Sequence, residues 1–89
     1  MIVIILEKVP AGLRGELSRW LCEVKVGVFV GAVSALVRDE LWQIVASKRR
    51  QGAALLVYPT NTEQGFAVKT LGTPRRPIYD LDGVFVAGR

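Results

Sequence analysis

Two features of the composition limit the catalytic chemistry open to this 89-residue chain: it has no histidine and only one cysteine, Cys22. Without an imidazole there is no Ser-His-Asp triad, no Cys-His dyad and no histidine for general acid-base catalysis. The same composition argues against a zinc site and supplies no disulfide framework. If the protein is an enzyme, carboxylates and a hard metal ion must do the work, and the eight Asp and Glu residues supply the candidates.

The basic side chains offer a second kind of chemistry, the binding of anions. Arg75 and Arg76 stand together in the proline-flanked segment "TPRRPIYD", away from any predicted helix end, so capping does not account for them. Lys48, Arg49 and Arg50 instead fall in the last turn of a predicted helix, where complementing the helix dipole explains them and no ligand role is predicted. A net charge of +4 and a pI near 9.7 are compatible with nucleic acid, although many other domains are as basic.

The elements that must position these residues follow from the apolar pattern. Pro10 opens a helix whose apolar positions recur at helical spacing, and Ser34 is a plausible N-cap for a longer helix that stops at Gly52. Runs of β-branched and apolar residues predict strands at 2–6, 24–31, 53–58, 66–71 and 84–87. The apolar positions expected on the helices are Leu13, Leu17, Trp20, Leu21 and Val24 in the first, and Val37, Leu41, Ile44 and Val45, with Trp42 at the edge, in the second.

The resulting order is β-α-β-α-β-β-β in one domain, residues 1–89, which predicts a ferredoxin-like α+β sandwich. Two helices can cover only one face of the sheet, yet several strands are apolar on both faces. Since 51% of the residues are hydrophobic, we expect a sheet-to-sheet homodimer that buries the second face. The lone cysteine favours a reducing cytoplasm, and the longest apolar run, Met1 to Leu6, is too short to span a membrane.

The segment "QGFAVKT", Gln64 to Thr70, has part of the pattern of an RNA-recognition strand, in which a basic residue and glycine precede alternating aromatics. In RNA-recognition domains that strand precedes the second helix, whereas this segment follows both helices. Gln64 also replaces the basic residue, and Lys69 and Thr70 replace the later aromatics. The pattern therefore favours Phe66 as a core residue rather than a base-stacking platform.

Four segments together resemble the small CRISPR-associated protein two family, in its type I-E branch. They are "LEKVPAGLRGELSRWLCEVKVGVFVG", "VSALVRDELW", "TNTEQGF" and "RRPIYDLDG", which follow the family order and spacing from Ile2 to Val86. The resemblance implies a ferredoxin-like homodimer that acts in CRISPR adaptation. There it would bridge two dimers of the integrase, CRISPR-associated protein one, and hold duplex prespacer DNA.

The resemblance also assigns candidate DNA ligands. Arg75 and Arg76 match a pair that contacts the DNA backbone, which suits a protein that accepts any prespacer, because phosphate contacts carry no sequence information. Arg14 matches a further DNA-contacting position, with a surface ion pair to a nearby Glu as the competing interpretation. Arg38, expected on the outer side of the second helix, is a weaker candidate.

The alternative function implied by the family is a magnesium-dependent endonuclease that cuts single-stranded RNA or duplex DNA. Glu7 stands where the wider family places a metal-binding Asp, so two symmetry-related Glu7 carboxylates would hold one Mg²⁺. Glu63 and Asp82 are further carboxylates in motif segments, although "DLDG" is also a turn signal. We favour the structural role over catalysis for this chain. A ligand-sensing module is a third hypothesis, for which the sequence shows no glycine-rich or polar ligand loop.

The sequence departs from the family pattern in two places. Gly12 and Leu36 stand where close relatives carry basic residues, which predicts weaker duplex binding or a different DNA path. The chain ends at "VAGR", whereas relatives continue with a short apolar segment that docks on the integrase. We therefore expect a shorter contact with the integrase or a trimmed copy.

Overall fold

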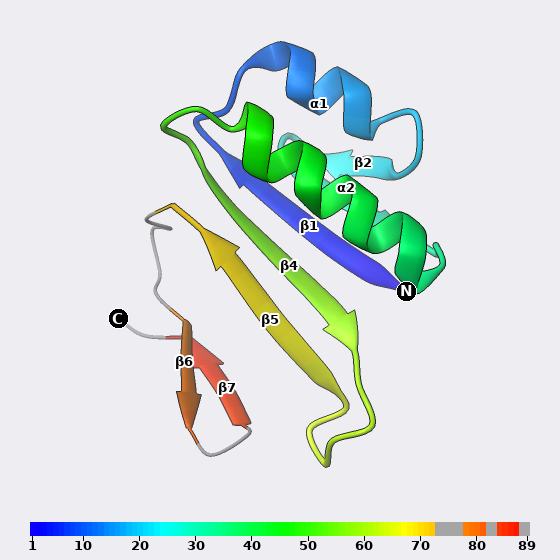
Figure 1. Cartoon of the computed structure of the whole chain (residues 1–89), viewed down its shortest axis with the longest axis vertical. Helices are drawn as coiled ribbons and strands as arrows, with labels where there is room; N and C mark the ends of the chain where they lie inside the picture. The colour runs from blue at the N-terminus through cyan, green and yellow to red at the C-terminus, as the bar shows by residue number, and fades with distance from the viewer. Residues whose placement is uncertain (73–77, 82–83, 88–89) are drawn as a thin grey trace.

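A five-stranded antiparallel sheet carries both helices on one face (Figure 1). The computed structural model describes the backbone of residues 1–72, 78–81 and 84–87 and the side chains of residues 1–72. The strands lie in the order β2-β3-β1-β4-β5, and the two helices are α1 and α2. Their bounds are β1 (Ile2–Glu7), α1 (Ala11–Leu17), β2 (Cys22–Lys25), β3 (Val28–Gly31), α2 (Ala35–Lys48), β4 (Ala53–Pro59) and β5 (Phe66–Leu71).

The predicted α+β class is confirmed. The first six elements run β-α-β-β-α-β, which is the ferredoxin-like order. A separate two-stranded antiparallel sheet follows, made by β6 (Ile78–Leu81) and β7 (Val84–Ala87). The β6 strand was not predicted, because the turn signal of "YDLDG" masks it in the sequence. Among the described residues, no helix has both the length and the apolar character needed to cross a membrane.

The predicted single strand at 24–31 is instead a hairpin of β2 and β3. α1 ends at Leu17, so the helical spacing that continued to Val24 was misleading, and Trp20 and Val24 are 58% and 62% exposed. The hairpin turns at Gly27, whose φ of 79° suits glycine. A side chain there would also collide with β1, because a Cβ on Gly27 would lie 2.6 Å from the Leu6 carbonyl oxygen. The hairpin is thus set by packing against β1, which local spacing does not reveal.

The start of α2 was predicted correctly and its end differs in detail. The Ser34 hydroxyl accepts a hydrogen bond from the Val37 N–H at 3.2 Å, which confirms the N-cap. At the C-terminal end the left-handed residue is Arg50, with φ 54°, and not Gly52. Gly52 serves a different need, close contact between two loops: a Cβ on it would lie 2.7 Å from the carbonyl oxygens of Glu7 and Lys8.

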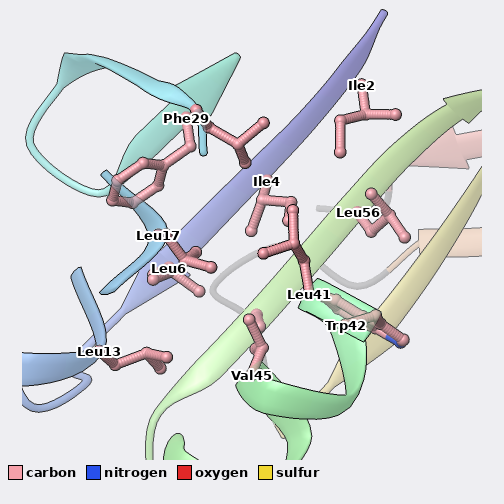
Figure 2. Packing of buried hydrophobic residues seen from close by; sticks show 12 residues of the cluster. Ile2, Ile4, Leu6, Leu13, Leu17, Phe29, Leu41, Trp42, Val45 and Leu56 are labelled. Carbon is pink, nitrogen blue, oxygen red and sulfur yellow. The ribbon is translucent and has the colours of Figure 1, made fainter. Parts of the chain in front are cut away.

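The hydrophobic core lies between the helices and one face of the sheet (Figure 2). Alternation along β1 buries Ile2, Ile4 and Leu6 on this face, since successive side chains of a strand point to opposite sides. Of the ten positions predicted for the helices, five are buried within α1 or α2, Val37 and Ile44 are partly buried, and Leu21 is buried beyond the end of α1. The remaining members of the buried cluster include Leu13, Leu17, Leu21, Phe29, Leu41, Trp42, Val45, Ala54 and Leu56.

The opposite sheet face, which we call the open face, carries a row of four valines. The strand register places Val30 beside Val3, Val3 beside Val57, and Val57 beside Val68, on four adjacent strands. All four are half-buried in the single chain. This is the face that the predicted homodimer would cover, and the dimer itself stays a prediction.

Phe66 also lies on the open face, because it pairs with Pro59, two positions along from Val57. It is half-buried and is not a member of the core cluster. The expectation that Phe66 is a core residue was therefore wrong. Ala67, its neighbour in β5, is buried on the helix side instead.

Candidate nucleic-acid interface

Arg14, on α1, forms an ion pair with Glu23 of β2. The Arg14 Nε donates to Glu23 Oε2 at 2.9 Å, and the two side chains are 35% and 22% exposed. The same carboxylate oxygen accepts the Gly27 N–H at 2.9 Å. The surface ion pair considered from the sequence is therefore present. Since Arg14 has further N–H groups beyond the one that Glu23 accepts, its role as a DNA ligand stays a prediction.

The ion pair and the turn together favour the charged form of Glu23. The hydrogen bond from Arg14 lowers the pKa of the Glu23 carboxyl below its ordinary value, and the hydrogen bond from the Gly27 N–H lowers it further. Both effects stabilise a carboxylate over a protonated acid. Glu23 therefore links α1, β2 and the hairpin turn through one negatively charged oxygen.

Arg38 does not lie on the outer side of α2, as was expected from the sequence. Its side chain is 19% exposed, and its guanidinium carbon stands 4.5 Å from the centre of the Tyr58 ring on β4. Its Nε and a terminal nitrogen both lie 3.2 Å from Asp39 Oδ1. The helix therefore turns Arg38 toward β4, where the Tyr58 ring and the Asp39 carboxylate orient it.

Tyr58 and Lys69 join Arg38 in a cluster that was not predicted from the sequence. Lys69 Nζ lies 5.6 Å from the Tyr58 ring centre, so the ring has a cation from α2 and another from β5. Tyr58 and Lys69 share the helix face of the sheet, because Tyr58 pairs with Ala67 and Leu56 with Lys69. We call Arg38, Tyr58 and Lys69 the aromatic-cation cluster. The cluster brings the positive charges of Arg38 and Lys69 to the Tyr58 ring.

Glu7 is the last residue of β1 and belongs to the open face with Val3 and Ile5. It pairs with Ala53 in the sheet register, is half-buried, and has an interaction partner within the chain. Among the described residues, Glu7 is not part of any group of three Asp, Glu, Cys or His side chains able to hold a metal. Within the part of the chain whose side chains are described, Glu7 therefore does not form a metal site with other protein ligands.

The remaining predicted candidates fall in two groups. Glu63 is exposed in the turn between β4 and β5. Arg75, Arg76 and Asp82 lie outside the described residues.

The last described residue before the Arg pair, Gly72, packs closely on the segment after α2. A Cβ on it would lie 2.7 Å from the Gly52 carbonyl oxygen and 2.9 Å from an Arg49 guanidinium nitrogen.

The cations at the end of α2 have separate structural roles. Lys48 Nζ lies 2.8 Å from Glu16 Oε2 of α1, which joins the two helices. The Arg49 guanidinium donates to the Gly52 carbonyl at 2.8 Å and so closes the helix end. Arg50 lies beyond the helix, in none of the ion pairs found among the described residues.

The two positions that depart from the family pattern are both on the surface. Gly12 is exposed in α1, and Leu36 is 70% exposed in the first turn of α2. Neither is needed for the core, so the absence of basic residues there is not imposed by packing. The consequence predicted for DNA binding stays open to test.

Fold and surface together define a small ferredoxin-like α+β domain with an open apolar sheet face and basic side chains on both helices. A family model described as CRISPR-associated protein (Cas_Cas2CT1978) matches residues 1–86. The chain therefore belongs to this family of CRISPR-associated proteins.

Proposed function

We propose that this protein is the type I-E form of the small adaptation subunit of CRISPR systems. As a homodimer it bridges two dimers of the integrase and holds duplex prespacer DNA without reading its sequence. Membership of the CRISPR-associated family supports the biological setting. The observation that carries the architectural role is the open face, with its row of four valines.

The open face supports dimerisation because a flat apolar sheet surface is stabilised when a second one removes it from water. Stacking two copies through this face leaves α1 and α2 of each copy on the outside. The helices, with Arg14 and Arg38, then remain available to a ligand on either side of the dimer. This arrangement suits a protein placed between two larger partners.

The basic side chains support a backbone-binding mode. Arg14 and Arg38 are held by carboxylates and an aromatic ring, and are therefore oriented before any ligand arrives. Guanidinium groups bind phosphate oxygens of any sequence. With Arg75 and Arg76 they give each copy four arginines for a duplex.

Titration of a labelled duplex at several salt concentrations tests DNA binding. The logarithm of the affinity should fall by about 0.9 per log unit of salt for each phosphate neutralised. The double variant Arg75→Ala/Arg76→Ala should show a shallower slope, while Arg19→Ala, at the exposed turn after α1, serves as the charge control. A parent protein that binds no duplex at low salt contradicts the proposal.

The bridging role is tested with the integrase. The purified proteins are mixed with duplex DNA, and the mass of the complex is measured by light scattering. One homodimer bound to two integrase dimers is the expected assembly. The same measurement without DNA shows whether protein contacts alone suffice for the assembly.

A magnesium-dependent endonuclease is the second candidate. The observation in its favour is that Glu7 belongs to the open face, so stacking two copies brings the two Glu7 residues to one interface. The carboxylates would supply oxygen ligands, and Mg²⁺ would activate water. Duplex DNA and single-stranded RNA are incubated with Mg²⁺ and either the parent or Glu7→Ala. Cleavage by the parent alone, with equal binding by both, would establish the nuclease.

A further inference from the structure

A shallow hollow lies where the loop after β1 meets the loop after α2, apart from Arg14 and Arg38 of the candidate site above. Lys8, Val9, Pro10, Arg50 and Gln51 line it, and we call it the corner hollow. Its volume is about 600 Å³. A second hollow of about 380 Å³ adjoins it, shares Pro10 and Arg50, and extends to Ser47 and Lys48.

The corner hollow carries two cations that stand outside the ion pairs of the described residues. Within that part of the chain the ion pairs are Arg14–Glu23, Arg38–Asp39 and Lys48–Glu16, so neither Lys8 nor Arg50 belongs to one. Glu16 lines the adjoining hollow but is held by Lys48. Two exposed cations and the Gln51 amide therefore face the same concave surface.

Both cations occupy a costly backbone conformation. Lys8 has φ 56° and Arg50 has φ 54°, and among the described residues they are the only ones other than glycine with positive φ. This left-handed region disfavours residues that carry a Cβ, and glycine or asparagine is the usual occupant. A glycine at position 50 would relieve this backbone strain, yet the residue there is an arginine. Strain kept at two residues of one hollow points to a role for their side chains.

The tight packing beneath the hollow fixes its two walls relative to each other. Gly52 lets the two loops approach closely: a Cβ on it would lie 2.7 Å from the Glu7 and Lys8 carbonyl oxygens and from Val9 Cγ1. Gly72 packs on the other side of Gly52, and the chain then continues toward Arg75 and Arg76. The two loops that line the hollow are therefore held in fixed positions, and the hollow is preformed.

We propose that the corner hollow binds a phosphodiester of the nucleic-acid backbone through Lys8 and Arg50. An ammonium, a guanidinium and an amide N–H₂ are the donors that phosphate oxygens accept. Val9 and Pro10 also line the hollow and give it an apolar surface, which suits the sugar next to a phosphodiester better than a free phosphate ion. This inference rests on the proposed function, because its ligand is the same duplex.

Two variants remove the charges without disturbing the backbone. Arg50→Gly and Lys8→Asn both place a residue suited to left-handed φ. The salt dependence of duplex binding is measured for each, with Arg19→Gly as the control of equal charge. We expect each variant to lower the slope of log affinity against log salt by about 0.9 for each phosphate that is no longer neutralised, and Arg19→Gly to leave it unchanged.

Denaturant unfolding of the same variants separates binding from folding. Arg50→Gly should keep or raise the midpoint of unfolding, so that weaker binding cannot be ascribed to a damaged fold. Inorganic phosphate is then added as a competitor, at concentrations matched in ionic strength to the chloride buffer. The difference in salt slope of duplex binding between the parent and Arg50→Gly should persist under these conditions. Loss of that difference in phosphate alone would identify a free-phosphate site instead and overturn the proposal.

The remaining outcomes are also decisive. Unchanged slopes for Arg50→Gly and Lys8→Asn, with a reduced slope for Arg75→Ala/Arg76→Ala, overturn the corner hollow and leave the proposed function intact. Equal slope changes for Arg19→Gly and Arg50→Gly show an effect of net charge and overturn the site. No duplex binding by the parent overturns the proposed function itself.

Discussion

Arg14 and Glu23 join α1 to the β2–β3 hairpin through a hydrogen bond of 2.9 Å between the Arg14 Nε and Glu23 Oε2. The pair stands where the sequence resemblance places a DNA ligand, so one arginine has both a structural partner and a proposed phosphate partner. A carboxylate beside a phosphate-binding arginine competes for it and weakens its contribution. The lowered pKa of Glu23 makes the contact between α1 and the hairpin sensitive to pH, and the competition makes the carboxylate a brake on phosphate binding by Arg14.

Acid should loosen the contact between α1 and the hairpin. Because the pKa of Glu23 is lowered in the folded chain, its charge stabilises the fold above its unfolded pKa of about 4.3, and that stabilisation is lost as the pH falls through the lower folded pKa. Glu23→Gln should therefore lose less stability than the parent as the pH falls below about 4.3. Denaturant unfolding at a series of pH values measures this, and a Glu23→Gln profile parallel to that of the parent would contradict the prediction.

Removing the competing carboxylate should strengthen duplex binding. Glu23→Gln leaves Arg14 its full charge for a phosphate, so the affinity should rise and the salt slope should steepen relative to the parent. Fluorescence anisotropy with a labelled duplex measures both. Arg14→Ala completes the comparison: if it binds as tightly as the parent, Arg14 is a structural residue only, and Glu63→Gln corrects for net charge.

Neighbouring residues of β4 should respond oppositely to lysine. Leu56 is 1% exposed and faces the helices, so Leu56→Lys buries an unpaired charge and should unfold the chain at a cost of several kcal/mol. Val57 is half-buried on the open face, so Val57→Lys should keep the fold and prevent the proposed stacking of two copies. Circular dichroism and sedimentation distinguish these results. A folded Val57→Lys that remains a dimer would show that copies associate elsewhere.

Two glycines should respond oppositely to alanine. Gly15 lies inside α1 with open space where a Cβ would be, so Gly15→Ala should stabilise the chain by about 0.5–1 kcal/mol. At Gly52 the new methyl would meet backbone oxygens at 2.7 Å, so Gly52→Ala should destabilise by about 1–3 kcal/mol. Urea unfolding of both variants checks the contrast. Equal effects would mean that the loops around Gly52 can separate freely.

The elements with strong local signals could be predicted from the sequence. The apolar run of β1, the Ser34 N-cap and the apolar face of α2 all depend on residues close in the chain, and each is present. The β2–β3 hairpin could not be predicted, because Val24 continues a helical spacing and the turn at Gly27 is fixed by contact with Leu6. The local pattern favoured a helix up to Val24, and the contacts with β1 determined a hairpin instead.

The candidate site was predictable in its residue types and not in its contacts. Sequence placed Arg38 on a helix but could not show that the helix turns it onto Tyr58, which comes from a distant strand. In the same way Arg50 belonged to a row of cations at a helix end, and only the backbone shows that it stands beyond the helix in a left-handed conformation. Pairing between distant elements decides which arginine is held and which is exposed.

The edge strand β2 bears on how far such a molecule can assemble. It is four residues long, its register shifts between Glu23 and Lys25, and it ends in a lysine. Short, bulged and charged edges discourage another chain from adding a strand. The β2 edge is therefore protected against strand addition, whereas β5 forms the other edge of the five-stranded sheet. We therefore expect copies paired through the open face not to recruit further chains at β2.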